Sequence, residues 1–250
     1  ANMHGWAAYT IYDDLLDASG DIRMLPLANA YMRLSFDGFL QAVPSAPSYH
    51  SFVRSVFNRI DAANTWEATN CRFVASGRSL HIAQLPDYGS QQQLAERSLG
   101  HALPVMAILA SQGVPPTDTR VRLLLRALAH YLIARQLGDD VTDWESDLRA
   151  GQCSAVVAHM LAARGITPGT HRTETLVKQL RQYLTARGQQ EIATLILSHT
   201  EQAERYLHKS NLVRPYSPIS QLIEDIALAA QQQLQEQADA RTFMAAYSGK

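Results

Sequence analysis

Five carboxylates crowd nine residues in the middle of the chain, directly after a strongly apolar run. They are Asp139, Asp140, Asp143, Glu145 and Asp147. On a helix, Asp139, Asp143 and Asp147 are four residues apart and share one face. Like charges at that spacing destabilise a helix unless a cation lies among them. The stretch is therefore either a solvated surface face or a cation site.

A second acidic cluster stands near the start of the chain, where Asp13, Asp14 and Asp17 follow the apolar residues 6–11. Carboxylates without His or Cys neighbours are hard oxygen ligands, which suit Mg²⁺ better than zinc or copper. Protein-bound Mg²⁺ commonly shares its coordination sphere with a substrate phosphate. If the two clusters lie on facing helices, they predict a site for Mg²⁺ and a diphosphate, where the metal stabilises charge as a carbon–oxygen bond breaks.

Apolar residues recur at helical spacing through most of the chain. We expect helical segments within residues 6–17, 25–43, 49–74, 94–111, 118–150, 155–163, 174–184, 190–207 and 219–246. No run alternates with the period of two that is typical of a half-buried strand. The sequence therefore predicts a single all-α domain, residues 1–250, of roughly eight to ten helices.

The composition restricts the partners and the compartment. The chain has 250 residues, 46% of them hydrophobic, and a net charge of −1, so we expect no binding to nucleic acid or to an anionic membrane surface. Cys71 and Cys153 lack metal-ligand spacing and are typical of buried thiols in a reducing compartment. There is neither an apolar run long enough to cross a membrane nor a secretion signal. We therefore expect a cytoplasmic protein without a transmembrane segment.

The acidic clusters resemble two known motifs. Asp13-Asp14-Leu15-Leu16-Asp17 resembles the first, aspartate-rich DDxxD motif of the class I isoprenoid synthases. The segment 136–143, Gln-Leu-Gly-Asp-Asp-Val-Thr-Asp, is similar to the QxxDDxxD second motif of polyprenyl diphosphate synthases. The same stretch also resembles phytoene and squalene synthases, through Asp143, Asp147 and Gly151. These families carry the two motifs on opposite walls of an all-α barrel around an apolar cavity.

The resemblance implies roles for particular residues. The catalytic, Mg²⁺-binding carboxylates would be Asp13, Asp14, Asp17, Asp139, Asp140 and Asp143, with Asp147 as a further metal ligand and three Mg²⁺ ions once substrate is bound. Arg23, Arg97, Arg135 and Gln136 would bind the diphosphate of an allylic prenyl substrate. Ionisation of that substrate would give a carbocation, and the prenyl group would pass to a second prenyl unit by chain elongation or head-to-head condensation.

Two departures from the family leave alternatives open. In the family several helices precede the first motif, whereas here almost no chain does, so we expect the missing barrel wall to come from sequence upstream of residue 1, from a homodimer or a partner chain, or to be absent. The alternative enzyme is a terpene cyclase, for which Arg205-Tyr206 would be the C-terminal pair. The alternative without catalysis is a scaffold or regulatory subunit of a prenyl synthase.

Overall fold

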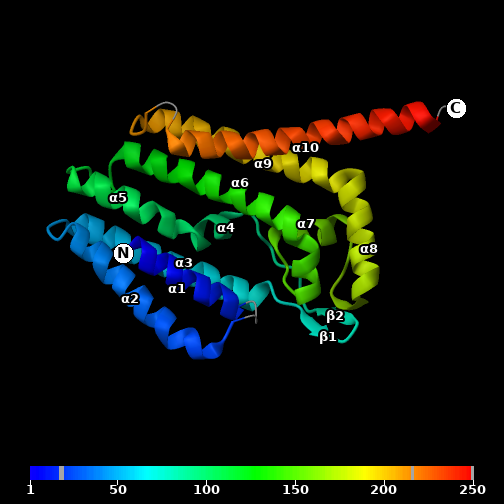
Figure 1. The fold of residues 1–250 in the computed structure, drawn as a ribbon, viewed down its shortest axis with the longest axis horizontal. Helices are drawn as coiled ribbons and strands as arrows, with labels where there is room; N and C mark the ends of the chain where they lie inside the picture. The colour runs from blue at the N-terminus through cyan, green and yellow to red at the C-terminus, as the bar shows by residue number, and fades with distance from the viewer. Residues whose placement is uncertain (17–19, 215–216, 249–250) are drawn as a thin grey trace.

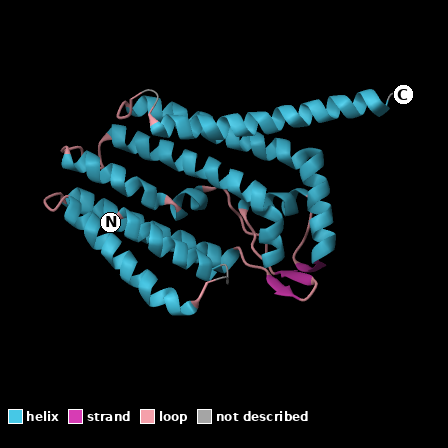
Figure 2. Cartoon of the chain, viewed as in Figure 1, coloured by secondary structure: helices cyan, strands magenta, loops and turns pink. Residues whose placement is uncertain are grey.

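The computed structural model describes residues 1–16, 20–214 and 217–248, and these residues are mostly helical (Figure 2). The first helices are α1 (Asn2–Leu16), α2 (Leu25–Ala42) and α3 (Pro47–Asn70), followed by the shorter α4 (Gln92–Arg97) and α5 (Ala102–Ser111). The second half of the chain contains α6 (Thr119–Ala150), α7 (Ala155–Ala163), α8 (Thr173–Tyr183), α9 (Gln189–Ser210) and α10 (Pro218–Ser248). The predicted all-α class is confirmed in this coarse sense.

The long helix α6 lies in the middle of the molecule, with α9 and α10 on one side and α3, α4 and α5 on the other (Figure 1). Its N-cap is Asp118, whose side chain accepts a hydrogen bond from the Arg120 backbone N–H and so satisfies one donor of the first turn. It ends at Gly151, where φ is +81°. A Cβ at Gly151 would lie 2.6 Å from the carbonyl oxygen of Phe73, so only glycine fits this end of α6.

The sequence pattern does not predict three short strands, β1 (Val74–Ser76), β2 (Ser79–Ile82) and β3 (Gly169–Arg172). They form one antiparallel sheet in the order β1-β2-β3, in which Leu80 pairs with His171. Each strand has only three or four residues, too few to display an alternation. The sheet joins residues about ninety positions apart and lies at one end of the molecule (Figure 2).

Separate groups of buried apolar side chains hold the two acidic segments in place. The larger group packs the second half of α6 against α7, α8 and α9. Another packs α3 against α5 and the first half of α6, with Tyr49, Val53 and Met106 fully buried. α1, the carrier of Asp13 and Asp14, packs mainly against α2 (Figure 1). In the described part of the chain, no helix has the length and apolar character needed to cross a membrane.

Candidate functional site

Side chains from both acidic clusters line one small cavity of about 180 Å³, which we call the acidic cavity. α1, α3, α4, α6 and the segment after α6 contribute to it. Its lining residues are Asp13, Glu67, Cys71, Tyr88, Leu94, Arg97, Gln136, Asp139, Asp140, Asp143, Asp147, Gln152, Cys153 and Ser154. The structure therefore brings Asp13 of the first acidic cluster into the same cavity as Asp139, Asp143 and Asp147 of the second.

The α6 wall of the cavity carries Asp139, Asp143 and Asp147 on one helical face, as their spacing predicts. The nearest cation to Asp139 is Arg135, with its Nε 3.8 Å from the carboxylate. Burial raises the pKa of Asp139, Arg135 opposes that rise, and the negative charge of Asp143 adds to it. Among the described residues, the Asp143 carboxylate has no hydrogen-bond or ion-pair partner. These carboxylates crowd one another in a way that a bound cation would relieve.

Asp140 differs from its neighbours because it is buried and both of its oxygens are engaged. Oδ1 accepts a hydrogen bond of 2.8 Å from Nε2 of Gln136, and Oδ2 accepts one of 3.0 Å from the backbone N–H of Ala155. Burial raises the pKa of Asp140 to about 6, although these hydrogen bonds oppose the rise. Asp140 thus ties α6 to the first residue of α7.

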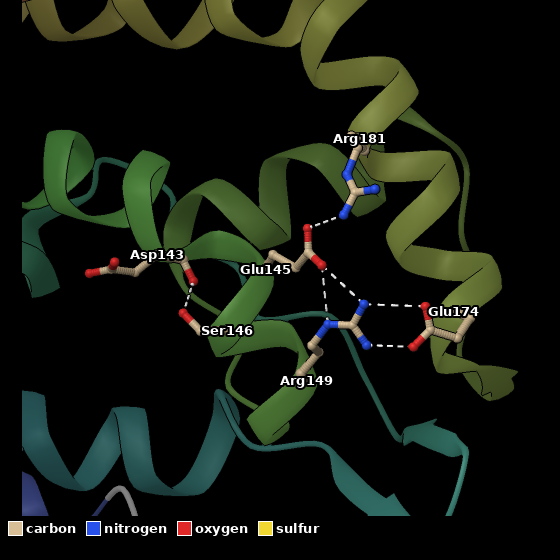
Figure 3. Close-up of polar contacts among 6 residues, drawn as sticks. All are labelled: Asp143, Glu145, Ser146, Arg149, Glu174 and Arg181. Carbon is tan, nitrogen blue, oxygen red and sulfur yellow. Dashed lines mark hydrogen bonds and ion pairs between the residues drawn. The ribbon is translucent and has the colours of Figure 1, made fainter.

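Glu145, the remaining carboxylate of this stretch, belongs to a network on another side of α6 (Figure 3). It accepts hydrogen bonds from Arg149 and Arg181, and Arg149 also binds Glu174 of α8 with a closest distance of 2.6 Å. In the same view Asp143 points away from this network. Glu145 therefore joins α6 to α8, and it does not line the acidic cavity.

The opposite wall is formed by α1 and by the cation of Arg97. Nη2 of Arg97 lies 3.4 Å from Oδ1 of Asp13, and its Nε lies 2.7 Å from Oε2 of Glu67. The Nε contact is close but poorly aligned for a hydrogen bond, so it acts chiefly as an ion pair. Burial alone would lower the pKa of Arg97, but Tyr9, Glu67 and Asp13 together raise it. Arg97 is therefore a permanent cation between α1 and α3.

Three more of the predicted site residues that the structure describes do not line the acidic cavity. Asp14 is exposed and does not line the acidic cavity, and Asp17 lies outside the described residues. Arg23 is almost fully exposed and pairs with Asp21 at 2.6 Å. Arg135 faces Asp139 without lining the cavity. Of the residues predicted to bind a diphosphate, Arg97 and Gln136 are the ones that reach the acidic cavity.

A second cavity, of about 410 Å³ and largely apolar, lies beside Arg97 between α1, α2, α3 and the segment before α5. We call it the apolar cavity. Its lining residues are Asn2, Met3, Gly5, Trp6, Tyr9, Met32, Ser35, Phe39, Phe57, Ile60, Arg97, Ser98, Gly100, His101 and Leu103. Arg97 lines both cavities, so a polar compartment and an apolar one meet at a half-buried cation.

The donor set of the acidic cavity suits a hard divalent cation, because Asp13, Asp139, Asp143 and Asp147 all present carboxylate oxygens. Within residues 1–16, 20–214 and 217–248, no three His, Cys, Asp or Glu side chains converge tightly enough to form a preassembled metal site. The residues therefore fit Mg²⁺ by chemistry, with ligands that the protein supplies from separate helices.

Three residues that line the acidic cavity, Tyr88, Cys71 and Cys153, belong to no motif in the sequence. The hydroxyl of Tyr88 donates to the carbonyl oxygen of Cys153 at 2.8 Å, and its oxygen also lies 3.3 Å from Sγ of Cys71. Burial raises the pKa of Cys71 to about 11 and also raises that of Cys153, so both thiols are protonated at neutral pH. Tyr88, Cys71 and Cys153 therefore form an uncharged part of the lining of the acidic cavity.

Comparison with family models, curated proteins and solved structures finds no match for this chain in any of the three.

Proposed function

We propose that this protein is a Mg²⁺-dependent isoprenoid synthase, which ionises an allylic prenyl diphosphate and transfers the prenyl group to a second prenyl unit. The observation that carries the proposal is the shared lining of one cavity by Asp13 of α1 and by Asp139, Asp143 and Asp147 of α6. The apolar cavity on the other side of Arg97 supports it further. An allylic prenyl diphosphate has a charged head that suits the acidic cavity with bound Mg²⁺ and a hydrocarbon tail that suits the apolar cavity.

The charged residues act on the diphosphate. Asp13, Asp139, Asp143 and Asp147 would hold Mg²⁺, which when bound would supply electrophilic stabilisation of the leaving group. Arg97 adds a fixed positive charge at the junction of the cavities, close to where the bond between the allylic carbon and the diphosphate oxygen breaks. A cation held in place before the reaction stabilises the developing charge without reorganisation. Binding requires Arg97 to exchange part of its contact with Asp13 for contact with the diphosphate.

The apolar residues act on the prenyl chain. Tyr9 and Phe57 line the apolar cavity with Ile60 and Leu103, and these side chains exclude water that would quench a carbocation. The ring faces of Tyr9 and Phe57 attract a cation through their quadrupoles. The same cavity would hold the acceptor chain, and the identity of that acceptor decides between chain elongation and head-to-head condensation.

The direct test is incubation of the purified chain with geranyl, farnesyl and geranylgeranyl diphosphates, each with and without isopentenyl diphosphate and Mg²⁺, followed by product analysis. A longer diphosphate indicates chain elongation, and a linear hydrocarbon of doubled length indicates head-to-head condensation. A cyclic hydrocarbon from one substrate molecule would instead favour a terpene cyclase.

The matched variants are Asp139→Ala and Asp37→Ala. Asp139 is more than half exposed, so its loss should leave the free energy of unfolding within about 0.5 kcal/mol while abolishing Mg²⁺-dependent turnover. Asp37 is an exposed carboxylate of α2 that lines neither cavity, and its removal should change neither property. Unchanged turnover in Asp139→Ala would refute the assigned role, and no turnover of the unmodified chain under any condition would favour the scaffold subunit.

A further inference from the structure

A third cavity, of about 570 Å³, lies beside the first half of α6 and shares no lining residue with the other two. α3, the start of α4 and α6 enclose it. Its apolar part includes Phe52, Leu99, Leu125 and Ile133, of which Leu99 and Ile133 are buried. Its volume is within the range of small-molecule sites in proteins. We call it the arginine cavity.

The charges that line this cavity are all basic: Arg59, Arg122 and Arg126, with His130 as a titratable neighbour. Arg122, Arg126 and His130 are four residues apart on α6 and therefore form one stripe. A stripe of like charges destabilises its helix unless an anion compensates it. Among residues 1–16, 20–214 and 217–248 no carboxylate lines the cavity, and the acidic side chains Glu96 and Asp118 pair with Arg59 and Arg120 instead of with this stripe.

The partners of these side chains show which positive charges are available. Arg59 is paired with Glu96 at 3.0 Å. Arg122 donates to the neutral backbone carbonyl of Thr117 at 2.9 Å, and Arg126 lies over the ring of Tyr206, with 5.7 Å from its guanidinium carbon to the ring centre. Neither of these two arginines forms an ion pair with a carboxylate among the described residues. Asp118 acts on Arg122 only at longer range, so both arginines can still bind an anionic group.

His130 presents a ring nitrogen without a protein partner. Its Nδ1 lies 2.9 Å from Nδ1 of His199, and Nε2 of His199 lies 3.0 Å from Oε1 of Gln91. If His199 donates to Gln91, its Nδ1 accepts from His130, and Nε2 of His130 then carries a lone pair. Nε2 of His130 has no hydrogen-bond partner in the described part of the chain. An anion in the cavity would therefore favour protonation of this nitrogen.

We propose that the arginine cavity binds a small soluble amphiphile with an anionic head, such as an alkyl phosphate, its head on Arg122 and Arg126 and its chain against Phe52, Leu125 and Ile133. The separation from the other cavities makes this site independent of the proposed isoprenoid chemistry. The binding requires neither Mg²⁺ nor turnover, so it is tested with the full chain in EDTA.

The test is calorimetric titration with octyl phosphate below its micelle concentration. We expect octyl phosphate to bind with a dissociation constant in the micromolar range. Inorganic phosphate lacks the alkyl chain and octyl glucoside lacks the anionic head, so each should bind at least about tenfold more weakly. Arg126→Gln and Arg122→Gln should each weaken binding by about tenfold or more. Arg120→Gln is the matched control, because Arg120 is on the same helix but pairs with Asp118 outside the cavity.

A second variant tests the apolar half. Ala129→Leu places a larger side chain inside the cavity, and it should weaken octyl phosphate more than inorganic phosphate. Circular dichroism checks that each variant folds. Equal losses in Arg120→Gln and Arg126→Gln would overturn the proposal, as would inorganic phosphate that binds as tightly as octyl phosphate. Binding that is lost only in Arg97→Gln would place the ligand in the apolar cavity and would equally overturn it.

Two further measurements sharpen the result. The pKa of His130 is lowered by burial and by the positive charges of Arg205 and Arg126, and His199 and Tyr206 are the other titratable groups against it. Octyl sulfate keeps a constant charge, so its affinity should rise as the pH falls and His130 becomes protonated, and this rise should vanish in His130→Asn. Sedimentation with phosphatidylcholine vesicles that contain phosphatidic acid tests a membrane source. Arg126-dependent sedimentation without octyl phosphate binding would refute the soluble ligand.

Discussion

The ion pair between Arg97 and Glu67 should stabilise the fold far more than an exposed pair of the same length. The side chains of Arg97 and Glu67 are 20% and 18% exposed, with 2.7 Å between Nε and Oε2. The pair of Arg120 and Asp118 has the same 2.7 Å between Nη2 and Oδ2, but Arg120 is 53% exposed. The two pairs therefore separate the effect of burial from that of distance.

The magnitude follows from what each substitution leaves behind. Removing one partner of a fully buried ion pair costs about 3–5 kcal/mol, because the remaining charge loses its compensation without regaining water. About a fifth of each side chain remains exposed here, so we expect a coupling energy of about 2 kcal/mol between Arg97→Gln and Glu67→Gln. For Arg120→Gln and Asp118→Asn, solvent screening limits the coupling to about 0.5 kcal/mol.

The assay is a double-mutant cycle for each pair, from urea unfolding followed by circular dichroism at pH 7 in EDTA. The N-cap hydrogen bond of Asp118 affects its single variant but cancels in the cycle. A coupling energy below about 0.5 kcal/mol for Arg97 and Glu67, or equal coupling in the two cycles, would refute the reasoning. Arg97 would then be an ordinary surface cation rather than a charge fixed between the two cavities.

Three further predictions concern pH, backbone conformation and cavity size. Burial, with a smaller effect of His130, lowers the pKa of His199 to about 4. Between about pH 6.5 and pH 4 the unfolded state therefore binds more protons than the folded state, and the free energy of unfolding should fall by about 2 kcal/mol as the pH falls. Urea unfolding measures this loss, which should be smaller in His199→Asn. Gly151→Ala should destabilise the fold by at least about 2 kcal/mol, because φ is +81° and the new Cβ would meet the Phe73 carbonyl; an unchanged melting temperature would contradict this. Ile60→Phe narrows the apolar cavity, so product analysis should show that the variant accepts only shorter prenyl chains than the unmodified protein. Ile108 lies on the exposed part of α5, so Ile108→Phe should not change the accepted chain length.

The sequence was sufficient to predict the helices and one wall of the site. The spacing of Asp139, Asp143 and Asp147 placed them on one helical face, and their common cavity agrees with it. The helix α6, Thr119–Ala150, matches the segment 118–150 that apolar periodicity predicts. These features depend on local geometry, which a single segment of chain determines by itself.

Tertiary contacts decide the features that the sequence could not predict. Asp139 and Asp140 are adjacent and chemically identical, yet only Asp140 meets the backbone N–H of Ala155, because α7 docks on that side of α6. Arg23 follows the first motif closely, but its side chain turns to Asp21. Glu67 belongs to no motif and reaches the site only because α3 packs beside α4.

The attachment of α1 has a mechanical consequence. α1 rests chiefly on α2, whereas α6 is clamped along its length by α9 and α7. One wall of the acidic cavity thus belongs to the pair α1–α2 and the other to the central helix α6. The width of the acidic cavity therefore depends on how α1 and α2 pack on the rest of the fold, as well as on the packing of α6. Of the two ion pairs of Arg97, the one with Asp13 joins α1 to the rest of the site, whereas the one with Glu67 joins α4 to α3.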